Sequence, residues 1–506
     1  MISLKHSAPW LLALGILLRC VALNQPIVDA HLLRQTQTAA ATQNMMQQGG
    51  VPLTANVPWL GDLDTRYLQE LPIYNYLAMG LFPLTGKLDP SGKIVSVAFW
   101  AFGFILLQGL WRRCLPQAAV FWANLVFVLG PLEVFFGQAF MPEMLVQVLG
   151  FGFLLATMRY SENPTLPRWI VCAGTGLLGL LVKTPEVSHL FFILAFLIAQ
   201  REGLSAFRKL RYWIALAIAL CALAAWSRYV DSVNSANVPR WTPHNALREF
   251  IGSVQDRLRP KSWMMVVFYL TAFVLPGPAA LAGAWGLRVA VRPPAARWLL
   301  LWLASLVLFF LIWFGNTAPK QSYYNLVAAG PLAGLFGLGA ADLLRRPWAS
   351  RWPRAAFAAF ATLLAAFSAP GIVYLFQQDR QILAASTWIR DHVPAGRPVI
   401  CQFNHRVDMM DYPYNAVPAY YSGRPVFIWT KALSEPNRKS ALERSGIAVV
   451  TLPNPPPSGL LGRFRRLRGQ ENVAPASTNW LAANGFHRVG TEPGFEIYAT
   501  DGMPSP

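Results

Sequence analysis

The feature that most constrains this chain is a series of apolar runs long enough, or almost long enough, to cross a lipid bilayer. A transmembrane helix needs about 17–25 predominantly apolar residues. Candidates occur near residues 8–24, 93–110, 118–136, 142–158, 169–184, 187–200, 212–227, 263–287, 298–314, 325–341 and 355–376. The segment from Lys183 to Glu186 divides one long stretch into the two weakest candidates. The sequence therefore predicts a polytopic α-helical membrane protein with about 11 transmembrane helices.

Composition supports a membrane protein and excludes several other classes. Of the 506 residues, 54% are hydrophobic and 13% are charged, whereas an ordinary soluble domain is about a quarter charged. The net charge is +19. The basic residues are spaced between apolar runs rather than clustered, so no nucleic-acid partner is expected. Four of the five cysteines lie in or beside apolar runs, so neither a disulfide framework nor a cysteine metal pair is expected.

The distribution of Lys and Arg predicts the orientation of the chain, because basic residues favour cytoplasmic loops. One set of alternate short loops carries Lys5, Arg112, Arg113, Arg159, Arg168, Arg201, Arg208, Lys209, Arg211, Arg288, Arg292, Arg297, Arg345, Arg346, Arg351 and Arg354. We expect these loops and the N-terminus on the cytoplasmic side of the inner membrane. A cleaved signal peptide is the alternative for the first run, but no small-residue cleavage site follows Leu23, which favours an uncleaved helix.

Two long polar regions are expected on the periplasmic side. The first, residues 25–92, is called the first loop, and the second, residues 377–506, is called the tail. The first loop belongs to a transmembrane domain, residues 1–376, and is expected to be structured. The spacing from Leu32 to Met46 predicts an amphipathic helix lying at the membrane interface, and an apolar helix is expected at 73–84.

The tail is expected to be a C-terminal extracytoplasmic α/β domain, because helix and strand patterns are mixed in it. Its expected elements are a helix at 379–392, strands at 398–403 and 425–429, a helix at 434–445, a strand at 446–452 and a strand pair within 486–499. The tail is long enough to have a modest core of its own.

Polar and ionisable residues at the predicted periplasmic face are the candidates for chemistry, because ionisable groups at membrane depth are costly and are usually functional. The predicted topology brings them to one face from separate segments. They are Asp29, His31, Arg34, Glu70, Glu143, Lys183, Glu186, Lys320, Gln321, Tyr323 and Tyr324. Their convergence, more than any single residue, predicts an active site there.

Three of these residues suit the displacement of a sugar from a lipid phosphate. Asp29, in a partly desolvated cleft, could accept the proton of a hydroxyl nucleophile. Arg34 and Lys183 could neutralise the charge that develops on the phosphate leaving group. Membrane lipids and a lipid-linked sugar are therefore the expected partners.

Two cofactor classes can be considered. Glu70 and Glu143, with His31 or His189, could hold a divalent cation that would also neutralise the phosphate. A structural role is the alternative for His31. The sequence contains neither GxGxxG nor a P-loop, so no nucleotide cofactor is expected.

Structural roles are alternatives for the other candidates. Asp29, Glu70 and Glu143 each lie close to the start of a predicted helix and could cap it. Arg34 could extend to lipid headgroups. Lys183 could complement the dipole of the helix that precedes it. A functional and a structural role can coexist at one residue.

Five motifs in these segments resemble those of a known family. They are Val28-Asp29-Ala-His31-Leu-Leu-Arg34-Gln35-Thr-Gln-Thr38-Ala39, Glu70-Leu-Pro72-Ile-Tyr74-Asn-Tyr76-Leu77, Met141-Pro142-Glu143-Met144-Leu145, Leu181-Val-Lys183-Thr-Pro185, and Tyr323-Tyr324-Asn-Leu with Gly330-Pro331-Leu-Ala. In this order they resemble GT-C superfamily glycosyltransferases that use polyprenyl-phosphate sugars, of the bacterial 39/83 type related to protein O-mannosyltransferases and lipid A aminoarabinose transferases. Two positions depart from the pattern: Gln321 stands where the family often has His, and Leu71 stands where the aminoarabinose transferases have Lys.

The resemblance implies a glycosyltransferase that moves a sugar from a polyprenyl-phosphate donor to an acceptor lipid, glycan or protein at the outer face. It implies inversion at the anomeric carbon, with Asp29 as the general base. It also implies donor-phosphate contacts from Arg34, Lys183, Tyr323 and Tyr324. The sugar and the acceptor do not follow from the motifs.

A transporter or flippase of a lipid-linked substrate is the alternative from another class. Transporters usually have paired halves with broken helices at equivalent positions. This sequence has one break, at 183–186, and no matching partner for it. The long first loop also favours catalysis.

Overall fold

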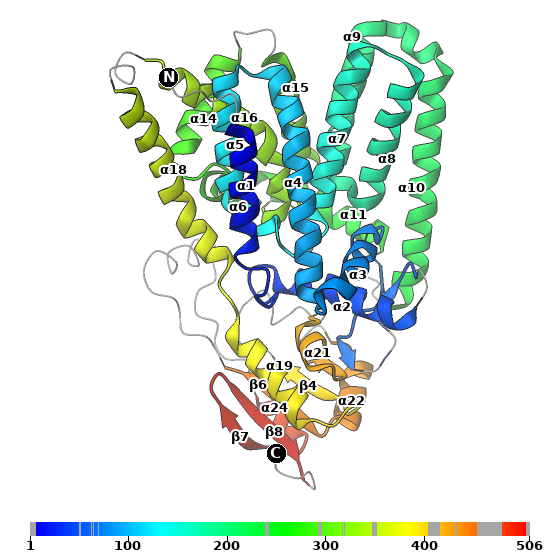
Figure 1. Ribbon diagram of the computed structural model, residues 1–506. Helices are drawn as coiled ribbons and strands as arrows, with labels where there is room; N and C mark the ends of the chain where they lie inside the picture. Colours follow the sequence, from blue (N-terminus) through cyan, green and yellow to red (C-terminus); the bar gives the residue numbers. More distant parts are fainter. Residues whose placement is uncertain are drawn as a thin grey trace.

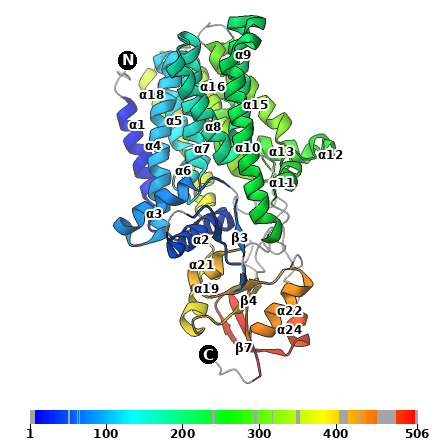
Figure 2. The ribbon, with the colours of Figure 1, turned by 90° about the vertical axis from the view of Figure 1, so that its right-hand side faces the viewer.

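The computed structural model describes residues 7–49, 52–61, 63, 65–68, 70–237, 242–291, 296–315, 317, 319–346, 352–402, 415–430, 433–452 and 478–501. Long helices lie side by side in one part of the molecule, and a sheet with shorter helices lies at one end of it (Figure 1). Helices from the first loop lie between the two parts (Figures 1 and 2). Of the basic loop residues named above, Lys5, Arg292 and Arg351 are outside the described ranges.

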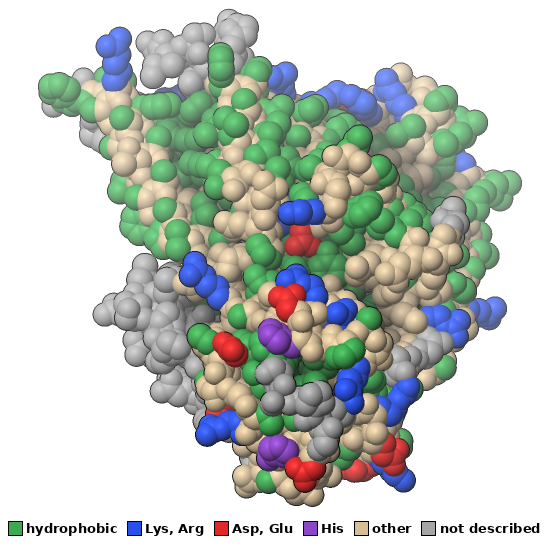
Figure 3. All heavy atoms as spheres, turned by 60° about the horizontal axis from the view of Figure 1, so that its bottom comes forward, with side chains coloured by type: hydrophobic (Ala, Val, Ile, Leu, Met, Phe, Trp, Pro, Cys, Tyr) green, Lys and Arg blue, Asp and Glu red, His purple; other side chains and the backbone are tan. Residues whose placement is uncertain are grey.

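The predicted apolar runs all lie on helices. The helical part consists of α1 (Ser7–Cys20), α4 (Leu88–Cys114), α5 (Gln117–Leu129), α6 (Pro131–Phe136), α7 (Glu143–Glu162), α8 (Leu166–Ser188), α9 (Phe191–Glu202), η2 (Gly203–Arg208), α10 (Leu210–Asn237), α11 (Pro243–Ile251), α12 (Val254–Leu258), α13 (Pro260–Tyr269), η4 (Leu270–Val274), α14 (Pro278–Ala290), α15 (Arg297–Ile312), η6 (Ser322–Ala328), α16 (Ala329–Leu343) and α18 (Pro353–Leu375). In the view of Figure 3 the surface of these helices is mainly apolar, and charged side chains lie toward the sheet and also along the far end of the helical part.

Among the described residues, fewer helices than the eleven predicted are both long enough and apolar enough to span a membrane. In the described part of the chain, 6 helices are long and apolar enough, or 7 if one bent pair counts as a span. Helices α1, α5 and α15 are apolar but have only 10–17 residues. The structure thus confirms a mostly helical chain with several candidate spans, while the number eleven stays a prediction.

Two of the predicted runs are interrupted rather than straight. The run at 263–287 consists of α13 with η4 and of α14, which meet at an angle of 101°. The bend contains Pro276, Gly277 with φ +56° and Pro278, and proline both removes a backbone N–H and ends a helix. In α8, Lys183 has φ −159° and ψ 94°, two residues before Pro185. The predicted break at 183–186 is therefore present, because Lys183 has a non-helical backbone and interrupts α8.

Glycines allow helices to touch backbone to backbone in the core. A Cβ at Gly339 of α16 would lie 1.8 Å from the carbonyl oxygen of Ala282 in α14, and one at Gly286 would lie 1.9 Å from that of Leu335. Gly337 similarly faces the carbonyl oxygen of Ala119, 2.3 Å from its Cβ position. Small residues at helix contacts of this kind are typical of membrane bundles.

The first loop contains the helix that the sequence predicted from Leu32 to Met46, but this helix buries polar as well as apolar residues. Its helix α2 (Leu32–Gln48) buries Leu32 and Ala40 but also the polar Gln35, Thr36 and Thr42. The reason is that α2 packs on both sides, against α3 (Ile73–Thr85) and α4 of the helical part and against α21 (Val417–Ser422) of the tail. The threonine hydroxyls are satisfied within the helix, donating to carbonyls of the preceding turn.

The tail contains helices and strands at the positions that its sequence pattern predicted. They are α19 (Arg380–His392), β4 (Val399–Gln402), β5 (Val426–Ile428), α22 (Glu435–Arg444), β6 (Ile447–Thr451), β7 (Phe486–Glu492) and β8 (Phe495–Thr500). Helices α21 and α24 (Asn479–Ala483) also belong to the tail and were not predicted. The sheet order is β2-β5-β4-β6-β8-β7. Strand β4 is parallel to β5 and β6, and the other pairs are antiparallel.

One strand of this sheet comes from the first loop. Strand β2 (Leu60–Gly61) pairs with β5, placing Leu60 opposite Phe427. A separate two-stranded ribbon of β1 (Ala55–Asn56) and β3 (Arg66–Tyr67) also belongs to the first loop. The two polar regions thus share a sheet, so the division between a domain at 1–376 and one at 377–506 remains a prediction.

Tyrosines attach the tail to the helical part. The Oη atoms of Tyr420 and Tyr421 donate to the two carboxylate oxygens of Asp89, at 2.6 and 2.8 Å. Tyr421 Oη also accepts from the backbone N–H of Ile27 at 2.7 Å. Backbone bonds join Ala30 N to Leu375 O at 3.0 Å and Asp379 N to Val28 O at 2.7 Å. The tail is therefore fixed around residues 27–30.

The contact between α14 and α16 gives a first prediction. We expect Gly339→Ala to lower the free energy of unfolding by about 1–3 kcal/mol, because the added methyl group forces two backbones apart. Thermal unfolding of the full chain in detergent measures this. Gly174→Ala in α8 is the matched control, because nothing lies within 4 Å of its Cβ position. Equal melting temperatures for the two variants would contradict the close contact.

Candidate active site

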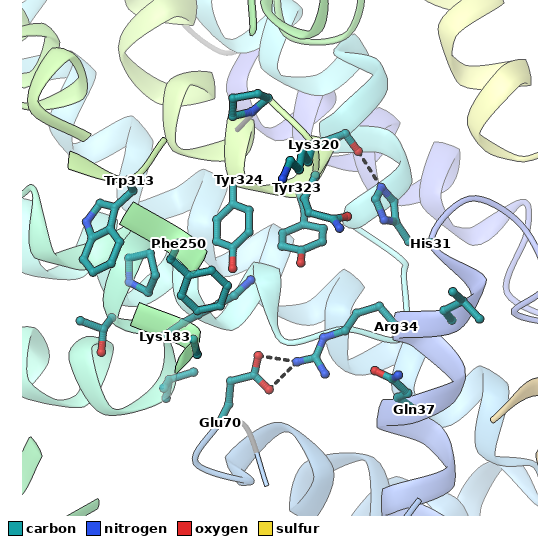
Figure 4. A pocket seen from close by; sticks show the side chains of 18 of the residues that line it. His31, Arg34, Gln37, Glu70, Lys183, Phe250, Trp313, Lys320, Tyr323 and Tyr324 are labelled. Atoms are coloured by element: carbon teal, nitrogen blue, oxygen red, sulfur yellow. Dashed lines mark hydrogen bonds and ion pairs between the residues drawn. The ribbon is translucent and has the colours of Figure 1, made fainter. Parts of the chain in front are cut away.

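A cavity of about 810 Å³ lies where the first loop meets the helical part. Its apolar lining comes from α10, α11, α13 and η4, and includes Trp226, Phe250 and Phe273. Its polar lining comes from the start of α2, from Glu70, from the kink in α8 and from residues 320–324 (Figure 4). A mixed lining of this kind suits a ligand with a charged head and an apolar body.

Most of the residues predicted for a site line this one cavity. They are His31, Arg34, Glu70, Lys183, Lys320, Gln321, Tyr323 and Tyr324. Figure 4 shows the side chains that it labels facing a common space. They come from four separate segments of the chain. Glu143 lies just behind the cavity wall, in contact with Lys183. Asp29 lies outside the lining, one residue before Ala30.

Arg34 and Glu70 form an ion pair on the cavity wall. Nη2 of Arg34 donates to both carboxylate oxygens of Glu70, and their side chains are 15% and 19% exposed. Helix α3 begins after Pro72 without a side-chain cap, so Glu70 binds Arg34 instead of capping the helix. This pair joins the two halves of the first loop and is neutral overall.

Lys183 is held between two carboxylates. Its Nζ lies 2.6 Å from Oε1 of Glu143 and 2.6 Å from Oε1 of Glu186. The same Nζ lies 4.4 Å from the ring centre of Tyr323 and 4.9 Å from that of Tyr324, within cation–π range. The kink in α8 places this ammonium so that it joins α7, α8 and η6.

The acids behind Lys183 border a second, small cavity. Glu143, Glu186 and His189 line it together with Tyr323. All three of these ionisable residues are buried. Lys183 thus separates the large cavity from an acidic pocket.

Two further lysines in the cavity lining are not neutralised in this way. Lys261 and Lys320 both line the cavity, and neither has an acidic partner within salt-bridge distance in the described part of the chain. Arg34 is balanced by one carboxylate, whereas Lys183 faces two. Lys261 and Lys320 are therefore the cations whose charge is most available to an anionic ligand.

Asp29 is buried in a polar shell beside the cavity. Its side chain accepts from Nε2 of Gln35 at 2.6 Å and from Nε2 of Gln378 at 3.4 Å. Burial raises the pKa of its carboxyl group from 3.8 to about 7, although Lys93 and these amides oppose the increase. A carboxyl group that titrates near neutral pH suits a general base.

His31 has an unusual backbone at the entrance to α2. Its φ of 59° makes it the only non-glycine residue with positive φ among those described. The ring lies 5.4 Å from those of both Phe136 and Tyr323, and Nε2 lies 2.7 Å from Oγ of Ser322. His31 thus connects the start of α2 with η6, and such strained conformations often occur at functional sites.

The carboxylates predicted to bind a metal are not arranged around a common ion. Glu70 is engaged by Arg34 and Glu143 by Lys183. Within the described ranges, no group of three His, Cys, Asp or Glu residues could hold a metal ion.

Several residues at the site were missed from the sequence. Gln35 donates to Asp29 and also accepts from the backbone N–H of Phe140 at 3.0 Å. Gln378 reaches Asp29 from the start of the tail. The position of Gln35 in the first motif was a signal for it, whereas nothing in the sequence connects Gln378 or Lys261 with the site.

Comparisons with known proteins identify the fold. No protein-family model and no curated protein matches the sequence. Solved structures match over nearly the whole chain, and those with this arrangement are glycosyltransferases of the GT-C superfamily. The chain therefore has a GT-C fold, as its motifs predicted.

Three of these structures illustrate the match. ArnT from Cupriavidus metallidurans bound to undecaprenyl phosphate is 13% identical, with a TM-score of 0.65, over 98% of this chain and 99% of that one. The oligosaccharyltransferase AglB from Archaeoglobus fulgidus, in complex with an inhibitory peptide and a dolichol-phosphate, is 14% identical, with a TM-score of 0.50, over 88% and 69%. Its complex with Zn and sulfate is 12% identical, with a TM-score of 0.52, over 97% and 73%.

The ion pairs of Lys183 give a second prediction. We expect Lys183→Met to lower the free energy of unfolding by about 3–5 kcal/mol, because it leaves Glu143 and Glu186 buried without their counter-charge. Thermal unfolding in detergent measures the change. Lys320→Met, the same substitution at an exposed side chain of the same cavity, is expected to unfold like the wild type. Wild-type stability of Lys183→Met would show that the carboxylates do not depend on this ammonium.

Proposed function

We propose that the protein is a membrane glycosyltransferase that moves a sugar from a polyprenyl-phosphate donor to a hydroxyl group of an acceptor lipid, glycan or protein. The reaction takes place at the outer face of the inner membrane, with the N-terminus in the cytoplasm and the tail in the periplasm. The short loops that carry Lys and Arg support this orientation, because basic residues favour the cytoplasmic side of a membrane. Asp29 is the proposed base, and the anomeric carbon is inverted.

The observation that carries the proposal is the cavity lined by both cations and apolar side chains. Helix α10, which supplies Trp226 and Leu223 to the lining, has only 6% of its most apolar stretch buried inside the protein. An exposed apolar helix of this length is suited to contact lipid. A prenyl chain can therefore approach the cavity from the bilayer while its phosphate meets the lysines.

Structures of the same fold support this choice of donor. ArnT was solved with undecaprenyl phosphate, and AglB with a dolichol-phosphate and an inhibitory peptide. Both ligands combine a phosphate with a long prenyl chain. The cavity of this chain offers cations for such a phosphate and apolar side chains for such a prenyl chain.

In the proposed mechanism the acceptor hydroxyl attacks the anomeric carbon of the donor. The new C–O bond forms while the bond between the anomeric carbon and the phosphate oxygen breaks, and a single displacement of this kind inverts the carbon. The hydroxyl proton passes to Asp29, which lies beside the cavity next to Ala30 of its lining. Polyprenyl phosphate leaves with the bonding electrons.

Positive charge in the cavity stabilises the leaving phosphate. Arg34, Lys183, Tyr323 and Tyr324 are the proposed contacts from the family motifs, and the charge balance adds Lys320. The AglB structure with Zn shows that a relative of this fold binds a divalent cation. In this chain the carboxylates that would hold one are engaged by Arg34 and Lys183, so the residues of the chain supply the charge in this proposal.

The role of Asp29 gives a third prediction. We expect Asp29→Asn to lower the rate of sugar transfer by about 100-fold or more, because an amide cannot accept the proton. The wild-type rate should fall as the pH decreases through about 7, the pKa at which burial places this carboxyl group, because only the charged form is a base. Transfer of label from a radiolabelled undecaprenyl-phosphate sugar to a membrane extract measures both.

The matched control is Asp391→Asn, the same change at an exposed residue that pairs with its neighbour Arg390. This variant should retain the wild-type rate and pH profile. Retention of the wild-type rate by Asp29→Asn would remove Asp29 as the base, and Glu70, the carboxylate in the cavity lining, would then be the next candidate.

The free charge of Lys320 gives a fourth prediction. We expect Lys320→Met to raise the KM for the undecaprenyl-phosphate donor by about tenfold, which corresponds to the loss of one charged hydrogen bond. Binding of undecaprenyl phosphate alone, followed by intrinsic tryptophan fluorescence, should weaken by the same factor. An unchanged affinity would place the phosphate away from Lys320.

A further inference from the structure

Lys93 is a buried lysine that the proposed mechanism leaves without a role. It lies in the second turn of α4 and is 0% exposed. Its Nζ donates to the carbonyl oxygens of Ala22 and Gln25, at 2.8 and 2.7 Å. Both carbonyls belong to the short segment that connects α1 with Asp29. Lys93 thus fixes the path of the chain immediately before the proposed base.

Lys93 is also the positive charge that acts on Asp29. Asp29 has no ion-pair partner within salt-bridge distance among the described residues, and its hydrogen bonds come from the neutral amides of Gln35 and Gln378. Lys93 favours the charged form of the Asp29 carboxyl group. Without this charge, burial alone would favour the neutral carboxylic acid.

The other ionisable groups around Asp29 have identifiable partners. Asp89, one turn before Lys93 on α4, accepts from Tyr420 and Tyr421 of the tail. Asp379, at the start of α19, accepts from the backbone N–H of Ile382 at 3.2 Å. None of these groups supplies a second cation, so Asp29 and Asp89 share the charge of Lys93.

We propose that Lys93 is a positioning residue for the transfer reaction, which fixes the segment before Asp29 and keeps the Asp29 carboxylate charged. The proposal rests on the proposed function, with Asp29 as the base. It also gives the tail a part in the reaction. By donating to Asp89, Tyr420 and Tyr421 satisfy the second carboxylate beside Lys93 and leave its charge available to Asp29.

A purely structural role for Lys93 makes a different prediction. An ammonium bonded to the carbonyls after a helix stabilises the helix end, and its loss would lower activity at every pH by the same factor. Loss of the charge beside Asp29 instead raises the pH at which the base becomes active. The pH profile therefore separates the two roles.

The experiment measures sugar transfer between pH 5 and 9 with the full chain in detergent, using the undecaprenyl-phosphate sugar that the wild type accepts. For Lys93→Met we expect the acidic limb of the profile to move up by about one pH unit or more, the usual effect of an opposite charge on a carboxyl group. Lys93→Arg keeps the charge and should retain the wild-type limb. Lys87→Met, the same substitution at an exposed residue just before α4, is the matched control and should change nothing.

Asp89→Asn provides a test with the opposite sign. It removes the anion that shares Lys93, so the acidic limb should move to lower pH. If thermal unfolding shows that Lys93→Met does not fold, Asp89→Asn tests the positioning role of Lys93 by itself. An unmoved limb in both folded variants would overturn the positioning role.

The outcomes also separate this inference from the proposed function. An active wild type with an inactive Asp29→Asn variant supports the function, and the Lys93 and Asp89 variants then test the inference alone. If Asp29→Asn remains active, the base has been assigned to the wrong residue and the inference fails with it. If Asp29→Asn is inactive and the acidic limb of the pH profile does not move in Lys93→Met or Asp89→Asn, only the role proposed for Lys93 is wrong.

Discussion

The structure depends on the partners of a few charges that are buried where the protein has little contact with water. An unpaired ion is costly in such surroundings, so each must find a counter-charge. Lys183 meets this requirement with Glu143 and Glu186, and in doing so joins α7, the kink of α8 and η6. Because Lys183 is buried, it needs the ion pairs with Glu143 and Glu186, and these same pairs hold the wall of the cavity in place.

The second constraint is the connection of three distant segments around residues 27–30. The end of α18, Tyr421 of α21 and Lys93 of α4 all bond to this short stretch or to the turn before it. Asp29 is therefore positioned by residues from both ends of the chain. The first loop, the tail and the helical part contribute jointly to the surroundings of this single carboxyl group.

Much of this arrangement follows from the sequence, because charge is rare in apolar segments. The scarcity of acids and bases singled out Arg34, Glu70 and Lys183, and the structure brings them to one cavity. Their pairing could not be predicted, since a cation can meet an anion or stay free depending on contacts between distant segments. The same limit applies to α2, whose polar residues are buried by contacts with distant segments, such as Gln35 with Phe140 and Thr42 with Asn75. The contact of Gln378 with Asp29 could not be predicted for the same reason, because the two residues lie far apart in the sequence.

The strand contributed by the first loop has a consequence for the order in which the molecule is made. Residue 60 emerges from the ribosome long before residue 427, its partner in the sheet. The pairing of β2 with β5, and with it the docking of the tail against residues 27–30, has to wait until residue 427 has been synthesised. Contacts between such distant parts of a chain form slowly. A nascent chain therefore has its early helices before the tail can complete the surroundings of Asp29, so the proposed site is finished only after this sheet has formed.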